Sequence, residues 1–383
     1  MALRYLDNAA TGPVRPEVLE AMMPFLTHWF GNPSSHHTVG EAAAEALADA
    51  RARVARVLGL RTGDIVFTSG GTEANNLAVK GIAIAAQLGR GAGHLVTTPI
   101  EHESVLESAQ YLARVHGFAV THVPVDAAAR VSPADVASAL RDDTALVSIG
   151  YANNEVGTIQ DVAAIAGIAR ARRIPVHIDA VQAAGWLPLS AADLGVDAIS
   201  IAGHKVGAPK GTGALGVRGR IPLEPLLHGG GQERGRRSGT EDVAGAVGLA
   251  TALELAEAER VEASARLTLL RDAFIRRVLD TVPTAHLTGD PVHRLPATAS
   301  FTFAGTSGEA VLLELERRGI VSSSGSACAA GSDEASHVLV AMGVPREVAQ
   351  TAVRFSFPHD LREPLDGVAD AVAASVAAIQ SGR

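Results

Sequence analysis

The sequence predicts an α/β protein: a large unit with a mostly parallel, seven-stranded sheet between helices, and then a smaller α+β unit. From about residue 40 to residue 260, apolar strand-like runs alternate with helical patterns. These runs are almost continuously apolar, which is typical of strands covered by helices on both faces. One long helical pattern follows, and the region after it has a different composition.

Seven short runs have the composition of buried strands. In chain order they are DIVFTS (64–69), HLVTTP (94–99), AVTHVPV (119–125), TALVSIGY (144–151), PVHIDA (175–180), AISIAG (198–203) and GALGVR (213–218). Helical patterns lie between them at 72–89, 104–117 and 162–174.

Residues 247–280 keep apolar side chains at i, i+3 and i+4 spacing, which predicts one long helix. Beyond it, strand-like runs at 297–305, 320–327 and 351–357 and a helical pattern at 308–319 indicate the smaller unit. We place the boundary inside the long helix. Residues 15–258 then form the large domain, and residues 1–14 with 259–383 form the small domain.

Composition excludes several classes of protein. The 383 residues contain one cysteine, Cys328, so no intrachain disulfide is possible and a cytoplasmic location is expected. No apolar run approaches the ~20 residues of a membrane span, and the first residues lack the apolar stretch of a signal peptide. A net charge of −8 argues against direct binding of nucleic acid.

Lysine is rare in this chain. Of the 33 basic residues only Lys80, Lys205 and Lys210 are lysines, and the rest are arginines. A lysine amine can be tuned to act as a nucleophile or base, whereas a guanidinium stays protonated. The sequence GHKVGAPKG, which holds two of the three lysines, is therefore a candidate for chemistry.

Polar residues follow the predicted strands at the point where each strand ends. Ligands of open α/β sheets bind outside the carboxyl ends of the strands, so these residues should meet at one edge. They are Gly71 and Thr72, Glu101 and His102, Asn153 and Asn154, Asp179 and Gln182, and His204 and Lys205. This convergence predicts the functional site.

The segment TSGGTEANN combines a strand end, a glycine turn and a helix start. The backbone N–H groups at the helix N-terminus, with the Thr72 hydroxyl, could hold a phosphate, but a simple helix cap fits the same residues equally well. No nucleotide P-loop motif occurs, and GTGALG (211–216) precedes a strand instead of a helix, which argues against a dinucleotide site.

Asp179 and Lys205 together indicate pyridoxal phosphate, provided that the phosphate cradle lies beside them. The lysine would form the Schiff base, and the acid would pair with the pyridinium nitrogen so that the ring can accept electrons. His102 could stack on that ring or could be an ordinary hydrogen-bonded histidine. Arg354, inside an apolar strand, is either an edge residue facing water or an anchor for an anion. The spacing of histidines supports no metal site.

The whole chain resembles the cysteine desulfurases, which are fold-type I pyridoxal-phosphate enzymes of the aminotransferase superfamily. Ten motifs carry the resemblance in order: YLDNAAT, GNPSS, TSGGTEANNLAVKG, EHESV, NNEVGTIQ, HIDAVQAAG, GHKVGAPKGTGAL, GGGQERGRRSGTED, SGSACAAGS and VRFSF. The length of the segment around Cys328 resembles that of the group that serves iron–sulfur cluster assembly.

The resemblance implies a role for each matched residue. Lys205 matches the Schiff-base lysine, Asp179 the pyridinium partner and Gln182 the donor to the ring hydroxyl. His102 matches the stacking, proton-relaying histidine, and Cys328 the nucleophile that accepts sulfur. Gly71, Thr72 and His204 match phosphate contacts, Thr240 matches a contact to the neighbouring subunit's phosphate, and Asn154 and Arg354 match groups around the ring and the substrate carboxylate.

The sequence departs from the family pattern in four places: Ala202 replaces a phosphate-binding serine, the pair Pro358-His359 replaces Gly-Arg, Ala335 replaces a proline and Gly12 replaces a threonine. The resemblance implies a homodimer that converts L-cysteine to L-alanine and passes sulfur from Cys328 to an acceptor protein. The alternatives on the same scaffold are a selenocysteine lyase and an aminotransferase. A scaffold that keeps the cofactor and only docks partners is a third.

Overall fold

The computed structural model describes residues 3–324 and 335–382, and its central feature is a seven-stranded sheet. The strand order is β2-β8-β7-β6-β5-β3-β4, and the strands coincide with the seven predicted runs. Their bounds are β2 Ile65–Thr68, β3 His94–Thr97, β4 Ala119–His122, β5 Thr144–Gly150, β6 Val176–Asp179, β7 Ala198–Ala202 and β8 Gly213–Val217. The predicted α/β class is therefore confirmed.

One strand runs against the others. β8 pairs antiparallel with both β2 and β7, whereas the remaining pairs are parallel. Only residues 203–212 separate β7 from β8, which is too short for the helical crossover that a parallel return requires. The sheet is thus mostly parallel, as predicted.

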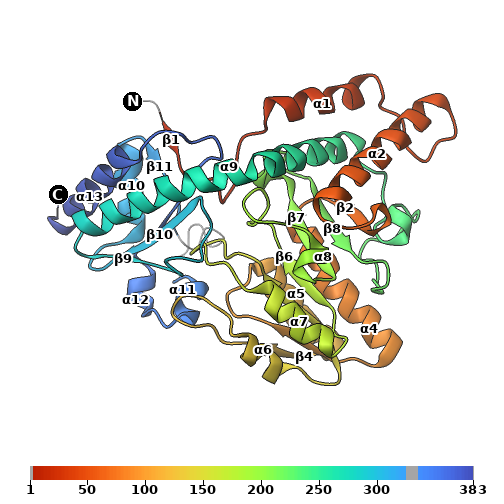
Figure 1. Cartoon of the computed structure of the whole chain (residues 1–383), viewed down its shortest axis with the longest axis horizontal. Helices are drawn as coiled ribbons and strands as arrows, with labels where there is room; N and C mark the ends of the chain where they lie inside the picture. The colour runs from red at the N-terminus through yellow and green to blue at the C-terminus, as the bar shows by residue number, and fades with distance from the viewer. Residues whose placement is uncertain (1–2, 325–334, 383) are drawn as a thin grey trace.

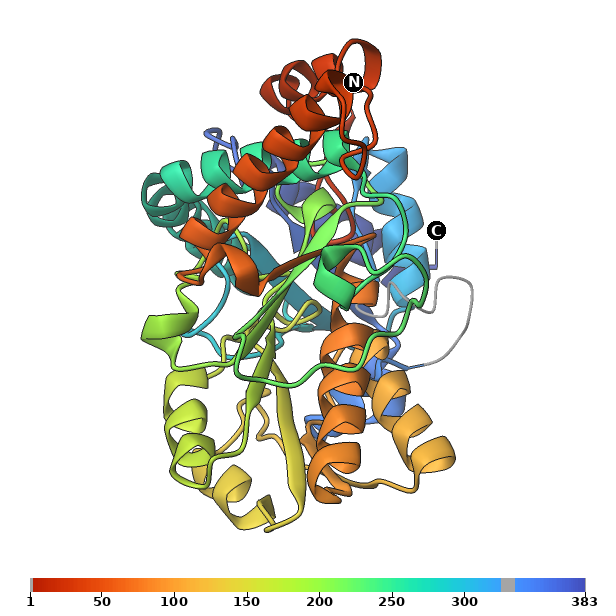
Figure 2. The same cartoon turned by 90° about the vertical axis from the view of Figure 1, so that its right-hand side faces the viewer.

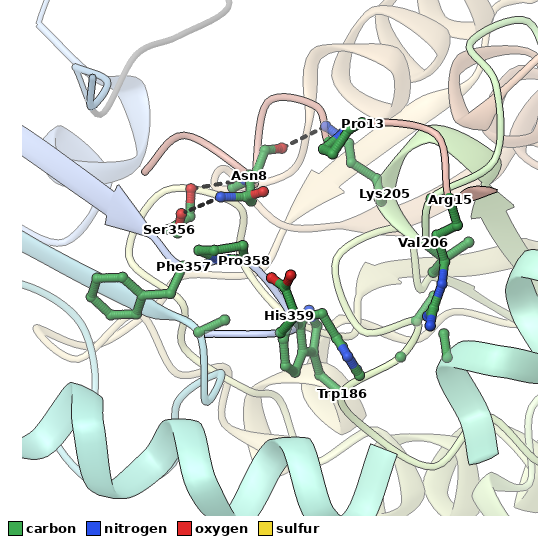
Figure 3. A pocket seen from close by; sticks show the side chains of 18 of the residues that line it. Asn8, Pro13, Arg15, Trp186, Lys205, Val206, Ser356, Phe357, Pro358 and His359 are labelled. Atoms are coloured by element: carbon green, nitrogen blue, oxygen red, sulfur yellow. Dashed lines mark hydrogen bonds between the residues drawn. The ribbon is translucent and has the colours of Figure 1, made fainter. Parts of the chain in front are cut away.

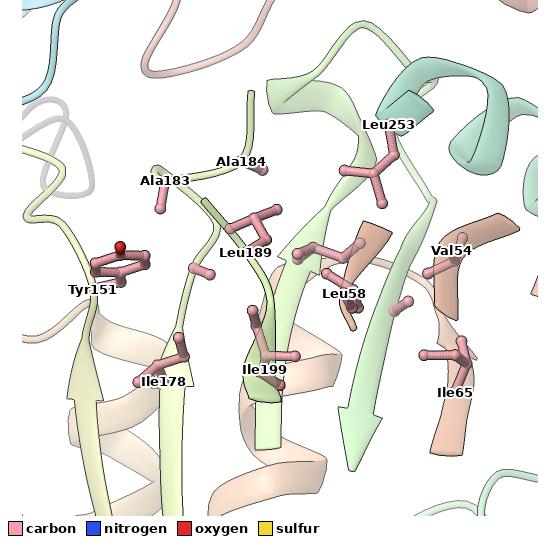
Figure 4. Packing of buried hydrophobic residues seen from close by; sticks show 14 of the residues in the cluster. Val54, Leu58, Ile65, Tyr151, Ile178, Ala183, Ala184, Leu189, Ile199 and Leu253 are labelled. Atoms are coloured by element: carbon pink, nitrogen blue, oxygen red, sulfur yellow. The ribbon is translucent and has the colours of Figure 1, made fainter. Parts of the chain in front are cut away.

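Helices cover both faces of this sheet (Figure 2). Figure 2 shows the orange helices α3 and α4 on one side and the yellow-green α7 on the other. Neighbouring residues of a strand alternate accordingly: Val147 of β5 packs in the cluster with α7, and Leu146 packs in the cluster with α4 and α5. Figure 4 shows the first of these clusters, where Ile178 and Ile199 of the sheet lie near Leu58, Leu189 and Leu253. The helices of this unit are α2 Thr38–Val57, α3 Gly71–Asn76, α4 Ile82–Arg90, α5 Glu103–His116, α6 Pro133–Ala139, α7 Val162–Ala171 and α8 Ala191–Leu194.

Four short turns of other helix types complete this unit. They are the 3-10 turns η1 Thr62–Asp64, η3 Gly203–Lys205 and η4 Glu233–Gly235 and the π-helical turn η2 Leu77–Gly81, which joins α3 to α4. The helix predicted at 72–89 is therefore confirmed, with a π turn inside it.

The long helix α9, Val243–Thr281, connects the two parts of the molecule (Figure 1). Its first half packs in the core of the large sheet through residues such as Leu249 and Leu253, and its second half packs in another core through Leu267 and Phe274. The predicted boundary at 258/259 lies between these two sets of contacts, in the middle of the helix.

The second core is built on a three-stranded antiparallel sheet of order β12-β10-β9. Its centre is a cluster of phenylalanines from α9 and the sheet, in which Phe274 packs edge-on against Phe301, Phe355 and Phe357. Its elements are β9 Ala285–Leu287, β10 Thr298–Phe303, α10 Gly308–Arg317, β12 Ala352–Ser356 and α13 Asp366–Gln380, with α11 His337–Ala341 and α12 Arg346–Ala349 beside them. The N-terminal β1, Arg4–Tyr5, pairs with β11, Ile320–Val321, and leads past this unit to α1, Pro16–Thr27.

Two absences hold for the described residues 3–324 and 335–382. None of their helices is long and apolar enough to cross a membrane. No group of three or more histidine, cysteine, aspartate and glutamate side chains among them could hold a metal ion.

Candidate active site

A cavity of about 510 Å³ opens at the carboxyl ends of the parallel strands. Segments from both parts of the chain line it, including Ala9 and Ala10 near the N-terminus and Arg354 of β12. Nine of the predicted site residues line this one cavity: Gly71, Thr72, His102, Asn154, Asp179, Gln182, His204, Lys205 and Arg354. Thr240 is exposed and does not line it, and Cys328 lies outside the described residues.

The predicted phosphate side of the cavity is narrow and rich in donors. A Cβ on Gly71 would lie 2.7 Å from Val181 Cγ2 and 3.2 Å from Ala202 Cβ, so this position requires glycine. The first turn of α3 presents backbone N–H groups and the exposed Thr72 beside Lys205 and Lys210, a donor set suited to a phosphate. The serine hydroxyl expected from the family is missing, because Ala202 stands there.

His204 borders the same side as a neutral imidazole. Its Nδ1 lies 3.2 Å from the hydroxyl of Thr11. Burial, followed by the positive charges of Lys205 and Lys210, lowers the pKa of His204 to about 4. His204 can therefore hydrogen-bond to a phosphate at neutral pH, while the lysines supply the positive charge.

Asp179 ends β6 and is held by two donors. Its Oδ1 accepts the backbone N–H of Val181 at 2.9 Å, and its Oδ2 accepts the side-chain amide of Asn75 at 2.6 Å. The Oδ1 of Asn75 is buried and has no partner among the described residues. Gln182 lies one turn further and donates its amide to the carbonyl of Ala9 at 3.0 Å. This fixed carboxylate is suited to pair with a protonated ring nitrogen.

Lys205 lies in η3, directly after β7. Its Nζ donates to the carbonyls of Ala9 at 2.5 Å and Ala10 at 2.7 Å. The amine is therefore positioned at the wall of the cavity on the same edge as Asp179. A carboxylate, a lysine and a phosphate-binding helix start at one edge are the groups that pyridoxal phosphate requires, so the residues present fit this cofactor.

Arg354 is almost fully buried, with 1% of the residue exposed, so the alternative of an edge residue facing water is wrong. Its Nη2 donates to Asp7 at 2.8 Å, and its Nη1 donates to the carbonyl of Asn154 at 2.8 Å. Its Nε is buried without a hydrogen-bond partner in the described part of the chain. The guanidinium is thus fixed at the cavity with donor capacity left for a carboxylate.

Two described residues on either side of residues 325–334 lie near this cavity. Ser323 exchanges two backbone hydrogen bonds with Arg354, at 2.7 and 3.1 Å. Ser336 donates its hydroxyl to Glu155 at 2.5 Å, and Glu155 follows Asn154 in the chain. Ser323 and Ser336 are thus both held by residues at or next to the site.

Three contributions to the site were not predicted. Asn75 and Ser104 hold Asp179 and His102, and Asp7 holds Arg354. Asn75 and Ser104 lie inside the motifs TEANN and EHESV, so the sequence indicated that they lie near the site. Which side chains they contact depends on the packing of α3 against α5. Asp7 is 347 residues away from its partner, and no local pattern could pair them.

Glu101 was identified at a strand end without a role. It is buried, accepts the hydroxyl of Thr98 at 2.6 Å and lines the cavity. Its Oε2 would lie 3.1 Å from a Cβ placed on Gly150, so the glycine makes room for the carboxyl group. Burial, with a smaller contribution from the charge of Asp179, raises the pKa of Glu101 to about 8. At neutral pH Asp179 is therefore beside a neutral acid.

A second cavity, of about 360 Å³, lies on the other side of Lys205 (Figure 3). It shares Ala9, Val181, Gln182 and Lys205 with the first cavity. In Figure 3 the ring of His359 lies beside Trp186, and their centroids are 4.8 Å apart. Two of the four departures from the family pattern concern this cavity, since Gly12 and the pair Pro358-His359 line it.

The chain is similar to known proteins over nearly its full length. A model described as aminotransferase class-V matches residues 4–363. The cysteine desulfurase IscS of Dictyoglomus turgidum is 46% identical, over 94% of this chain and 92% of the relative, and that of Methanosarcina thermophila is 47% identical, over 96% and 90%.

Solved structures agree with these matches. A NifS-like protein superposes with a TM-score of 0.88 at 38% identity, covering 99% of this chain and 98% of the other. A structure described as SspA in complex with cysteine superposes with a TM-score of 0.82 at 38% identity, covering 93% and 99%. The chain therefore belongs to the class-V aminotransferase family and, within it, to the cysteine desulfurases, enzymes that depend on pyridoxal 5'-phosphate.

Proposed function

We propose that the protein converts L-cysteine to L-alanine and takes the sulfur onto Cys328 as a persulfide, which it then passes to an acceptor protein. The observation that carries this proposal is the convergence of nine predicted residues on one cavity, with Ser323 and Ser336, the described residues on either side of Cys328, bonded to Arg354 and Glu155. A solved relative is described as a complex with cysteine, which supports the same substrate here.

Each side chain has a role that follows from its position. Lys205 attaches the cofactor, Asp179 pairs with the ring nitrogen and Gln182 donates to the ring hydroxyl, while Gly71, Thr72 and His204 hold the phosphate. Arg354, with Asn154 beside it, binds the carboxylate of the substrate. When bound, pyridoxal phosphate supplies an electron sink for the carbanion that forms at the substrate Cα.

Two residues of this chain move protons and sulfur. The amine of Lys205, when free, would remove the Cα proton as a base. The thiolate of Cys328 would attack the substrate sulfur: a sulfur–sulfur bond forms, the carbon–sulfur bond breaks, and its electron pair stays with the carbon product. That product takes one proton at the carbon that lost the sulfur and regains the Cα proton from Lys205, so the enzyme thiol and cysteine become an enzyme persulfide and alanine.

The arrangement of subunits belongs to the same proposal. Thr240 is exposed and away from its own cavity, which is consistent with a contact to the phosphate of a second copy in a homodimer. Helix α1 supports this arrangement, because Leu19, Met23 and Leu26 form an exposed apolar stripe at 49, 52 and 58% exposure. We also propose that the boundary between the two domains lies at 258/259. The single cysteine favours a cytoplasmic location. The sulfur acceptor that we propose is an iron–sulfur scaffold or a thiolation enzyme.

The decisive experiment measures alanine and persulfide together. The purified protein with its cofactor should release alanine from L-cysteine, and mass spectrometry after brief exposure should find one extra sulfur on Cys328. Cys328→Ser should keep the bound cofactor and release no alanine, because a hydroxyl cannot accept the sulfur. Alanine release by this variant would indicate a lyase instead, and a strict need for a keto acid would indicate an aminotransferase.

The homodimer has its own test. Thr240→Ala should weaken cofactor retention, and a mixture of this variant with Lys205→Ala should regain part of the activity if sites are shared between subunits. Sedimentation of a fully active monomer would contradict the shared site.

A further inference from the structure

A chain of hydrogen bonds connects Asp179, assigned to the ring nitrogen of the cofactor, with His102, assigned to stack on the ring. Asn75 Nδ2 donates both to Asp179 Oδ2 at 2.6 Å and to the hydroxyl of Ser104 at 2.9 Å. The hydroxyl of Ser104 in turn lies 2.8 Å from Nδ1 of His102. Asn75 and Ser104 are buried, at 1% and 6% exposure, and all four residues line the cavity.

The direction of each bond can be assigned. The backbone N–H of Ser104 donates to Nδ1 of His102 at 3.0 Å, because His102 caps the N-terminus of α5. An amide N–H can only donate, so Nδ1 must be the acceptor and carries no proton. The Ser104 hydroxyl already receives an N–H from Asn75, and its own hydrogen is therefore available for the same Nδ1.

The orientation of Asn75 is fixed in the same way. Its amide nitrogen faces the carboxylate of Asp179, and turning the amide over would place its oxygen against that carboxylate. Its own Oδ1 has no partner among the described residues, so this orientation is maintained by the two bonds that the nitrogen donates. Because Asn75 donates to Ser104 and Ser104 donates to Nδ1 of His102, only the neutral tautomer of His102 with its proton on Nε2 fits these hydrogen bonds.

We propose that Ser104 and Asn75 are positioning residues that hold His102 as the neutral tautomer protonated on Nε2 and link that tautomer to Asp179. The proposal rests on the proposed function, because it assigns His102 its part in that reaction. A proton on Nδ1 would face the backbone N–H of Ser104, which can only donate, so Nδ1 of His102 serves as an acceptor in this arrangement. It therefore serves as a hydrogen-bond donor through Nε2, and the duty of base falls to Lys205.

The test compares two buried serines of the same helix. Ser104→Ala removes the hydroxyl that contacts His102. Ser108→Ala is the matched control, because the Ser108 hydroxyl is also buried, bonds among the described residues only to the backbone carbonyl of Ser104, at 2.7 Å, and does not line the cavity. Both variants are prepared with bound cofactor. Nitrogen NMR of protein labelled with ¹⁵N-histidine reports which ring nitrogen carries the proton. The signal of His102 is the one that is missing from the spectrum of His102→Gln.

Expected in the wild type is a His102 signal with the proton on Nε2 only. Ser104→Ala should shift that signal toward a mixture of forms and lower kcat about 10-fold with little change in KM, since misplaced catalytic groups cost of this order. Ser108→Ala should change neither. If Ser104 acts through His102, adding Ser104→Ala to His102→Gln should cause no further loss of rate.

Two NMR results would overturn the proposal: a wild-type His102 protonated on Nδ1, or a Ser104→Ala variant whose His102 signal is unchanged. A full further loss of rate in the double variant would also contradict it, because Ser104 would then act independently of His102. The NMR result does not depend on turnover. If the wild type formed no alanine from cysteine, the proposed function would be wrong. The NMR spectrum would still report which ring nitrogen of His102 carries the proton, so the two failures can be told apart.

Discussion

Two cavities of comparable size, about 510 and 360 Å³, lie on either side of a wall that contains Lys205. The first collects titratable groups from many segments, with Asp179, Glu101 and His204 among them. The second is lined in large part by residues within 8–17 and 356–360, and two of its charged residues, Arg15 and Glu259, neutralise each other through hydrogen bonds of 2.5 and 3.0 Å. Cavity volume alone therefore does not identify a site; the convergence of polar side chains from several strand ends does.

The difference follows from where each cavity lies in the fold. The first lies at the carboxyl ends of β5, β6 and β7, where parallel strands deliver the residues that follow them to one edge. The second lies between the N-terminal segment, the residues after β12 and α9, where side chains mainly fill space between the two cores. Four substitutions test whether chemistry is confined to the first cavity, in order of expected effect.

The largest effect is expected from Lys205→Arg, in the shared wall. The guanidinium keeps the charge but cannot attach the cofactor or act as base, so alanine formation should fall by about 1,000-fold or more. Borohydride reduction should fix the cofactor to Lys205 in the wild type and to no residue in the variant. Lys80→Arg, in the π turn beside Tyr111, is the control and should keep full activity. Labelling of Lys210 would contradict the assignment.

Arg354→Gln should reduce both binding and stability. The substitution leaves Asp7, whose side chain is only 17% exposed, without its charged partner, and the free energy of unfolding should fall by about 2 kcal/mol. The KM for cysteine should rise as well, because the carboxylate loses its guanidinium. Urea unfolding and steady-state kinetics measure the two effects. An unchanged KM would place the substrate carboxylate elsewhere.

Glu101→Gln should change how stability depends on pH. The folded protein raises the pKa of Glu101 to about 8, so between about pH 5 and pH 7.5 it keeps a proton that the unfolded chain releases. This group alone therefore lowers the free energy of unfolding as pH rises, by about 1 kcal/mol per pH unit, and the loss ends above the folded pKa. The glutamine variant should lack this slope in urea unfolding at a series of pH values. Parallel curves for the two proteins would show that Glu101 is ionised when folded.

Glu259→Gln, in the second cavity, should have the smallest effect. The pair with Arg15 is partly exposed, at 23% and 40% of the side chains, and contributes about 1 kcal/mol or less. The rate of alanine formation should stay within about twofold of the wild type. A large loss of kcat would mean that the second cavity takes part in the reaction, and the contrast between the two cavities would fail.

Much of the fold was predicted from the sequence. All seven strands of the large sheet and the long helix were placed, because near-continuous apolar runs and a 3.6-residue period are local properties. The direction of β8 was not specified, and the pairing of β1 with β11 was missed. These features depend on which segments meet, and two-residue strands such as β1 carry no periodic pattern.

The sequence by itself determined the candidate residues of the site, because strand ends of an α/β sheet share one edge and the rare lysines mark where an amine is needed. The tertiary structure decided how those residues are held. The partner of Arg354 is Asp7 and that of Asp179 is Asn75, and the donors on His102 fix its tautomer. Such contacts join side chains from segments far apart in the chain. Hydrogen bonds depend on distance and direction, and only the packing of the two parts around α9 sets these.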